Sequence, residues 1–384
     1  MKNSRLNSID FLRGCAAMAV VFFHACVTGK LMELLTIYPL WFQAIAWTLE
    51  FAKMGVALFF VISGFCIHLK WSKELAETGQ ERSLNFVGFW KRRLNRLYPP
   101  YVIALTLTML MVVVAFYVGI NIKTINNYPD PKHVWLVIDY FTHLTMLHGF
   151  HPALDQGAGN SVYWTLAREE FLYLLYFPLL AWRRGYGLIN SLTGVVILGL
   201  IFSLGMKFFI TEDSAWWEII KTSALALWVQ WCLGMVAVEA YYGLIKLPKW
   251  CYFGWLVPVF GVLSIVSERH TQLLSPILWG LTFFILLNYC VKRESEGRWS
   301  MSFVVRKFSR IGIWSYSLYL VHYPIQIVVG ILLELNKITL SNLWIVSGYI
   351  LLLIIISSIG GWIFFCIVEK NFLVFAAQGP EESK

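Results

Sequence analysis

Residues 9–28 read IDFLRGCAAMAVVFFHACVT, an apolar stretch long enough to cross a membrane that also carries Arg13 and His24. The two side chains are eleven positions apart, which is about three turns of an α-helix and about 16 Å of rise, so they lie on one face at different depths. Ionisable groups inside a span are costly, which makes each a candidate functional residue. The stretch predicts a site with a cation near one membrane face and a titratable imidazole deep inside.

The composition extends the membrane interpretation to the whole chain. Of its 384 residues, 58% are hydrophobic and only 14% are charged, whereas about 25% of the residues of a soluble domain are charged. The formal charge of +9 would favour a nucleic-acid partner only if the basic residues gathered on a solvated domain, and they lie between apolar segments instead. We therefore expect an integral membrane protein without a nucleic-acid partner.

Ten apolar segments predict an all-α, polytopic bundle of about ten transmembrane helices, at residues 9–28, 51–70, 97–119, 163–182, 188–210, 222–243, 251–267, 272–291, 312–333 and 343–367. If the N-terminus is inside, 21 of the 31 Lys and Arg residues fall on that side and eight fall in outer loops. Because inner loops carry the excess of basic residues, both termini are predicted to be cytoplasmic. We expect a transmembrane domain at residues 1–377 and a short cytoplasmic tail at residues 378–384.

Signals for a signal peptide or a metal site are weak. Asp10 and Arg13 interrupt the start of the first stretch, so it is predicted to be a retained span. The seven Cys form no CxxC pair, and the four His of the outer loop at residues 121–161 lack HExxH spacing, so neither a disulfide framework nor a metal site is predicted. That loop is instead a candidate lid or acceptor platform.

Residues 86–96 (FVGFWKRRLNR) interleave aromatic and basic residues, as an interfacial helix on the inner membrane face does. Lys91 and Arg92 are explained by topology and by attraction to anionic lipid headgroups. Arg93 and Arg96 are three positions apart and share a helical face, so their guanidinium groups are suited to bind phosphates. The pair is therefore a candidate ligand site, with lipid binding as the alternative.

Three proton-active residues are predicted at similar depths below the outer membrane boundary. With 1.5 Å of rise per residue and a core of ~30 Å, His24 lies about 8 Å, Glu169 about 9 Å and His322 about 12 Å from that boundary. If their helices adjoin, Glu169 would fix the tautomer of His24 and raise the basicity of its other nitrogen. These three are the predicted catalytic residues, and a purely structural hydrogen-bonding role for His322 stays open.

Two further residues are predicted to support the site. Asp10 lies one helical turn before Arg13 and is expected to orient its guanidinium. Ser63 precedes Gly64 in an apolar segment, where it is either a nucleophile or a small residue that allows close helix packing.

Five segments resemble, in order and spacing, the integral-membrane acyltransferase-3 family: IDFLRGCAAMAVVFFH (9–24), GVALFFVISGF (55–65), FWKRRLNRLYPPY (89–101), VYWTLAREEFLYLLYFP (162–178) and SYSLYLVHYP (315–324). The resemblance covers essentially the whole chain. Arg13 and His24 resemble the Arg-x10-His motif of the family, Arg93 and Arg96 its RxxR motif, and Glu169 the first acidic residue of its WSLSVEE motif.

The resemblance implies an acyl-CoA-dependent O-acyltransferase of the bacterial inner membrane. It would move an acyl group, commonly acetyl, from cytoplasmic acyl-CoA to a hydroxyl of a carbohydrate or lipid-linked sugar of the cell envelope, without a metal. Arg13, Arg93 and Arg96 would bind the donor. Ala57 and Arg168 depart from the usual residues of the family, so the acceptor is not implied. No hydrolase-like domain is appended, so we expect the membrane domain to complete the transfer, alone or with a partner.

Two other classes remain as alternatives. A polytopic transporter or exporter of an envelope precursor would also carry buried Arg, His and Glu, but it is expected to show two related halves, and none is evident in the sequence. A non-catalytic partner in envelope assembly would tolerate the replacement of His24. The acyl group and the oligomeric state are left open.

Overall fold

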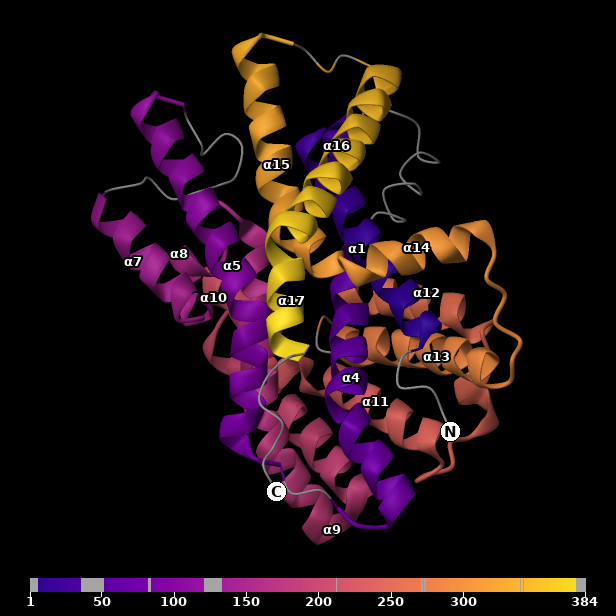
Figure 1. Cartoon of the computed structure of the whole chain (residues 1–384). Helices are drawn as coiled ribbons and strands as arrows, with labels where there is room; N and C mark the ends of the chain where they lie inside the picture. The colour runs from indigo at the N-terminus through magenta and orange to yellow at the C-terminus, as the bar shows by residue number, and fades with distance from the viewer. Residues whose placement is uncertain are drawn as a thin grey trace. The chain divides into compact units, whose positions relative to one another are not determined.

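The computed structural model of the protein describes residues 6–35, 52–81, 84–120, 133–211, 213–270, 272, 274–338, 340 and 342–377. These residues form helices and turns without a β-strand, which confirms the predicted all-α fold (Figure 1). They divide into two compact units. Unit 1 comprises Met1–Ala19, Glu50–Ser83 and Thr165–Ile313, and unit 2 comprises Val20–Leu49, Leu84–Trp164 and Trp314–Lys384. The predicted tail at residues 378–384 lies outside the described residues.

Eight helical segments of the described chain are long and apolar enough to cross a membrane, so the protein is a multi-pass integral membrane protein. Helix α9 (Trp164–Phe209) contains two of the predicted spans and is interrupted at Gly187, whose φ of 77° and ψ of 168° are not helical. Helix α12 (Leu256–His270) has 15 residues. That length corresponds to about 22 Å, which is less than the ~30 Å of the bilayer core. The count of ten spans and the side of the termini stay predictions.

Unit 1 holds the N-terminal part of α1 (Asn7–Thr28), most of α9, and α12. Its other elements are α4 (Gly55–Thr78), α10 (Ala215–Lys221), α11 (Ala224–Tyr242), η3 (Lys249–Tyr252), α13 (Ser275–Ser295) and α14 (Phe303–Ile313). Helix α4 packs along α11, and α13 packs against both. The helices touch closely because Gly64 and Gly234 lie at their crossing, where a Cβ would overlap the carbonyl oxygen of Trp231 or Val61.

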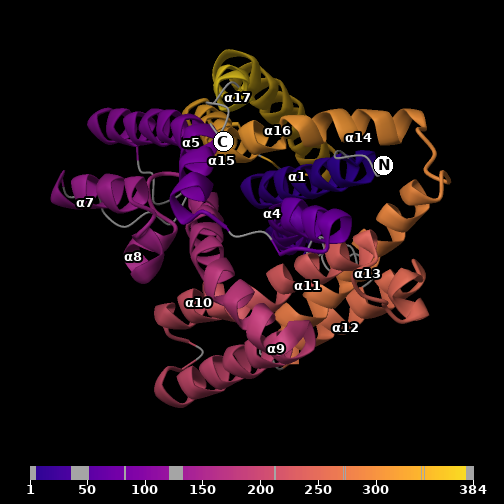
Figure 2. The same ribbon diagram turned by 60° about the horizontal axis from the view of Figure 1, so that its bottom comes forward.

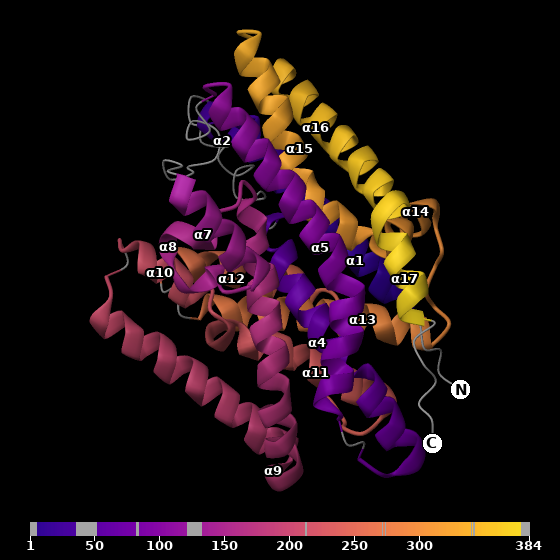
Figure 3. The same ribbon diagram turned by 60° about the vertical axis from the view of Figure 1, so that its left-hand side comes forward.

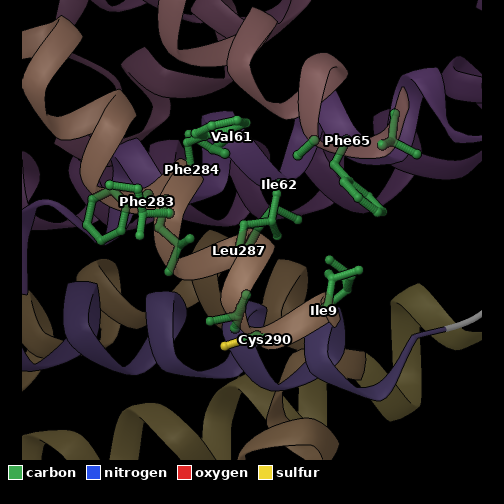
Figure 4. Packing of buried hydrophobic residues seen from close by; sticks show 14 of the residues in the cluster. Ile9, Val61, Ile62, Phe65, Phe283, Phe284, Leu287 and Cys290 are labelled. Carbon is green, nitrogen blue, oxygen red and sulfur yellow. The ribbon is translucent and has the colours of Figure 1, made fainter. Parts of the chain in front are cut away.

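The core of unit 1 joins α1, α4 and α13. Figure 4 shows buried side chains that interdigitate there, among them Ile9, Val61, Ile62, Phe65, Phe283, Phe284, Leu287 and Cys290. In lipid, such contacts stabilise a bundle through van der Waals packing, because the surrounding acyl chains are as apolar as the side chains themselves. This packing fixes the first turns of α1, which carry Arg13, against α4.

Unit 2 holds the C-terminal part of α1, and its other elements are α2 (Leu31–Leu35), α5 (Phe86–Tyr117), α7 (His133–Leu144), η1 (His148–Phe150), α8 (Pro152–Asp155), η2 (Ser161–Tyr163), α15 (Ser315–Leu335), α16 (Leu343–Phe364), η4 (Phe365–Glu369) and α17 (Lys370–Ala377). Helices α15 and α16 lie side by side (Figure 3). The buried Glu369 carboxylate accepts bonds from the backbone N and the hydroxyl of Ser317, at 3.1 and 2.5 Å. It therefore satisfies a donor in the first turn of α15.

The predicted interfacial helix at residues 86–96 is the first part of α5 and not a separate element. Helix α5 has 32 residues and continues through Pro99 and Pro100. At 1.5 Å per residue it is about 48 Å long, so it exceeds the bilayer core and leaves room for its basic turns at the membrane surface.

Candidate active site

Two histidines face each other in unit 2, His24 on α1 and His322 on α15. The Nδ1 atom of His24 lies 3.3 Å from Nε2 of His322, and the ring centroids are 5.2 Å apart. His322 is fully buried, whereas His24 is half-buried and also lies against the ring of Tyr323. The structure therefore brings together two of the three predicted catalytic residues.

Backbone carbonyls determine which ring nitrogens of this pair carry protons. Nδ1 of His322 lies 3.1 and 2.9 Å from the carbonyl oxygens of Leu318 and Tyr319, and Nδ1 of His24 lies 3.0 Å from that of Val20. A carbonyl oxygen only accepts, so both Nδ1 atoms are donors and both Nε2 atoms bear lone pairs. His24 thus shares its Nδ1 proton between Val20 and His322. Its own Nε2 has no hydrogen-bond partner among the described residues and is ready to accept a proton.

Gln326 fixes the helices that carry the histidine pair. Its side-chain amide donates to the carbonyl of Val21 on α1, at 3.1 Å, and to the hydroxyl of Ser357 on α16, at 3.3 Å. The Ser357 hydroxyl lies 3.5 Å from the carbonyl oxygen of His322. Since Gln326 and Ser357 are fully buried, these bonds form away from water and hold α1, α15 and α16 in one register.

A proline two residues after His322 frees the backbone carbonyl through which the outer segment is attached to α15. Pro324 has no backbone N–H, so the carbonyl of Leu320 loses its helical donor. Asn160 and Tyr163 supply replacements, because the Asn160 amide donates to this oxygen at 3.0 Å and the Tyr163 hydroxyl at 3.4 Å. The end of the predicted lid is therefore fixed within one helical turn of His322 along the chain.

Arg13 and its partners lie in unit 1. One terminal guanidinium nitrogen of Arg13 lies 3.8 Å from the Cys66 sulfur, and Asp10 and Glu169 interact with Arg13 electrostatically. Asp10 therefore lies where it was expected, beside Arg13. Glu169 belongs to the same surroundings, and its pairing with His24, a residue of unit 2, stays a prediction.

Ser63 is held by two aromatic residues of unit 1. Its hydroxyl lies 3.2 Å from the Tyr173 hydroxyl and accepts from the Trp231 indole at 3.4 Å. None of these groups is a strong base, and the neighbouring Gly64 lies at the crossing of α4 and α11. The contacts favour the packing interpretation of Ser63 over a nucleophile.

The basic pair of unit 2 lies near the start of α5. Arg93 is half-buried, with its guanidinium carbon 5.5 Å from the centre of the Phe89 ring, and Arg96 is exposed one turn further along. Their positions on one helical face suit two phosphate oxygens.

Comparison with known proteins assigns the chain to a family. A family model described as an acyltransferase domain matches residues 6–362. The chain belongs to this acyltransferase family. The match covers every predicted site residue, from Asp10 to His322.

The chain has several bacterial relatives. It is similar to O-acetyltransferase OatA of Staphylococcus aureus, at 24% identity over 85% of this chain and 51% of that protein, and to peptidoglycan O-acetyltransferase OatA of Listeria monocytogenes, at 23% over 88% and 51%. Nodulation protein 10 of Rhizobium leguminosarum bv. viciae is 31% identical over 46% of this chain and 45% of that protein. The chain thus spans about half the length of the curated relatives it matches. No solved structure matches it significantly.

The structure contains two polar clusters that were not predicted from the sequence. In unit 1, the buried His68 contacts Glu239 and Tyr176, each at 2.9 Å, and Arg183 donates to Glu239 at 2.7 Å. His68 and Glu239 both lie inside predicted spans, and ionisable residues in a span are the sequence signal that could have identified this cluster. In unit 2, the rings of His143 and His148 stack with their centroids 3.8 Å apart. Among the described residues, no group of three His, Cys, Asp or Glu is arranged to hold a metal ion.

Proposed function

We propose that this acyltransferase is a membrane-bound O-acyltransferase of the bacterial inner membrane, which moves an acyl group, acetyl in the first instance, from cytoplasmic acyl-CoA to a hydroxyl of a cell-envelope carbohydrate. The family match and the names of the OatA relatives support this reaction class. Within the structure, the histidine pair carries the proposal, because the hydrogen bonds leave Nε2 of His24 as a base on a half-buried side chain.

The proposed chemistry begins at His24. Its Nε2 takes the proton of the acceptor hydroxyl while the hydroxyl oxygen attacks the thioester carbonyl carbon. The C–S bond then breaks, the ester is formed, and the CoA sulfur leaves with the proton that His24 returns. His322 is the positioning residue in this scheme, since its Nε2 accepts the Nδ1 proton of His24 and stabilises the imidazolium by a charge-assisted hydrogen bond. A covalent acyl-His24 relay is the variant of this scheme.

The donor is proposed to be held by arginines. Arg93 and Arg96 bind phosphate groups of acyl-CoA from the cytoplasmic side, and Arg13, supported by Asp10 and Glu169, binds a further part of the donor. In this scheme the arginines determine the affinity for the donor, and the histidines determine the rate of acyl transfer.

Purified full-length protein in lipid nanodiscs tests the reaction. It is incubated with [14C]acetyl-CoA, and release of CoA and transfer of label are followed with and without envelope carbohydrate acceptors. Wild type is expected to release CoA and lose label from the donor, and His24→Ala is expected to lose this activity by about 10²-fold or more. His270→Ala, at the end of α12 and outside the site, is the matched control. Full turnover by His24→Ala would contradict the proposal, and movement of an unmodified envelope precursor into sealed proteoliposomes would favour the exporter.

A further inference from the structure

Helix α14 carries three basic side chains on one face. Arg306, Lys307 and Arg310 occupy positions i, i+1 and i+4 of the helix, and all three are exposed. No carboxylate among the described residues forms an ion pair with any of these three side chains. At 100° per residue the three lie within about 100° of one another, so they form a single cationic surface.

The opposite face of α14 is fixed against α1. Ser309 and Gly312 are buried there, and the Ser309 hydroxyl donates to the backbone carbonyl of Asn7 at 3.4 Å. A Cβ on Gly312 would overlap the Asp10 carbonyl, and a Cβ on Gly14 would overlap the Phe308 carbonyl. Figures 1 and 2 show α14 against this part of α1. Because the two backbones touch, α14 is held with its basic face turned outward.

Exposed apolar residues accompany the basic face. Phe303 and Val304, at the start of α14, are 68% and 57% exposed, and the Lys307 ammonium lies 5.3 Å from the centre of the Phe303 ring. A helix that exposes both cations and large apolar side chains is typical of a membrane interface. The charge distribution of the loops predicts that this segment faces the cytoplasm, where anionic lipids are concentrated.

We propose that the basic face of α14, formed by Arg306, Lys307 and Arg310, binds the headgroups of anionic phospholipids at the cytoplasmic membrane surface. The phosphate oxygens accept hydrogen bonds from the two guanidinium groups and the ammonium, and Phe303 inserts at the level of the acyl boundary. Through its glycine contacts, α14 links the bound lipid to the turn of α1 that carries Arg13. Lipid binding at this face does not require the acyl-transfer reaction.

Native mass spectrometry of the full-length protein, purified with phosphatidylglycerol and phosphatidylcholine, tests the proposal. The variant R306Q/K307Q/R310Q keeps the length of the side chains and removes their charge. It is expected to bind phosphatidylglycerol on the order of 100-fold more weakly, because each basic residue near the surface strengthens anionic lipid binding several-fold. The single variants R306Q and R310Q provide intermediate steps if the triple variant folds poorly.

The matched control removes three charges from the last turn of α13 and from the segment that joins α13 to α14. In K292Q/R293Q/R298Q the altered residues already contact Tyr252, Tyr289 and Glu296, so this variant is expected to retain lipid like wild type. Equal loss in both triple variants would show an effect of net charge alone and overturn the site. Acetyl-CoA binding by delipidated protein in neutral detergent is expected to be unchanged. Weaker acetyl-CoA binding with lipid retention intact would instead assign the face to the donor phosphates.

Discussion

The proton positions of His24 and His322 decide what the pair can do. A neutral imidazole accepts a hydrogen bond as a carboxylate does, but it brings no negative charge to the membrane interior, where an isolated charge is costly. His322 is fixed by its own backbone carbonyls and so presents a lone pair, not an N–H, to His24. This arrangement orients the proposed base at a lower desolvation cost than an aspartate.

Replacement of His322 is expected to separate orientation from packing. His322→Leu removes the acceptor for the His24 proton and should lower kcat by about 10²-fold, with the KM for acetyl-CoA nearly unchanged. His322→Gln restores a carbonyl oxygen of similar reach and should recover a large part of that loss. Steady-state kinetics with labelled acetyl-CoA measure both. Equal defects in the two variants would indicate that His322 only fills space.

Replacement of Glu169 distinguishes the two roles proposed for its carboxylate, one as a partner of Arg13 and the other as a partner of His24. Because Glu169 interacts with Arg13 in unit 1, Glu169→Gln is expected to raise the KM for acetyl-CoA by about tenfold while kcat changes little. Glu170→Gln provides the neighbouring control. A fall in kcat with an altered pH–rate profile would instead support the pairing of Glu169 with His24.

Close helix crossings depend on glycine in this protein. At the crossing of α4 and α11, Gly64 and Gly234 each meet a backbone carbonyl of the other helix. In lipid, where no hydrophobic force drives helices together, such close approach provides much of the packing energy.

Gly64→Ala is therefore expected to destabilise the protein by about 1–3 kcal/mol, because the added methyl group forces α4 and α11 apart. Thermal unfolding in detergent, monitored by tryptophan fluorescence, should show this destabilisation as a lower Tm. Gly185→Ala is the matched control, since Gly185 is exposed in α9 with no atom near the position of a Cβ. The control variant should keep or slightly raise the Tm through better helix propensity.

Asn160 is expected to hold the outer segment on α15. Asn160→Ala leaves the Leu320 carbonyl with a single, longer bond from Tyr163, which costs about 1–3 kcal/mol at a buried site. Backbone amides of residues 148–163 should exchange hydrogen about tenfold faster or more. Asn190→Ala is the control, because that side chain is exposed and, among the described residues, bonds only to the Tyr186 carbonyl within α9. Unchanged exchange at 148–163 in Asn160→Ala would contradict this role.

At the scale of the whole molecule, the sequence predicts the helical class and the membrane location well, because apolar length and charge distribution report them directly. The depths of His24 and His322 calculated from helical rise stay predictions, although the structure places the two rings side by side. The sequence does not predict that Gln326 and Pro324 organise the histidine pair, because those roles depend on which helices adjoin. The cluster of His68, Glu239 and Arg183 is missed for the same reason.

The predicted arrangement of the termini is testable with fusions. Green fluorescent protein at the C-terminus should fluoresce and alkaline phosphatase at the same place should be inactive, because ten spans return the chain to the cytoplasm. A second pair of fusions, placed within residues 292–302, tests on which side of the membrane α14 lies. Active phosphatase at either position would contradict the predicted orientation.

The contact between Ser317 and Glu369 has a consequence for biogenesis. The two residues are 52 positions apart, so α15 leaves the ribosome before the carboxylate that caps its first turn has been synthesised. Until that carboxylate arrives, the backbone N–H of Ser317 must be satisfied by water or by the insertion machinery. We therefore expect the first turn of α15 to acquire its final hydrogen bonds only after Glu369 is translated, and a truncation before Glu369 should leave this turn without its carboxylate acceptor.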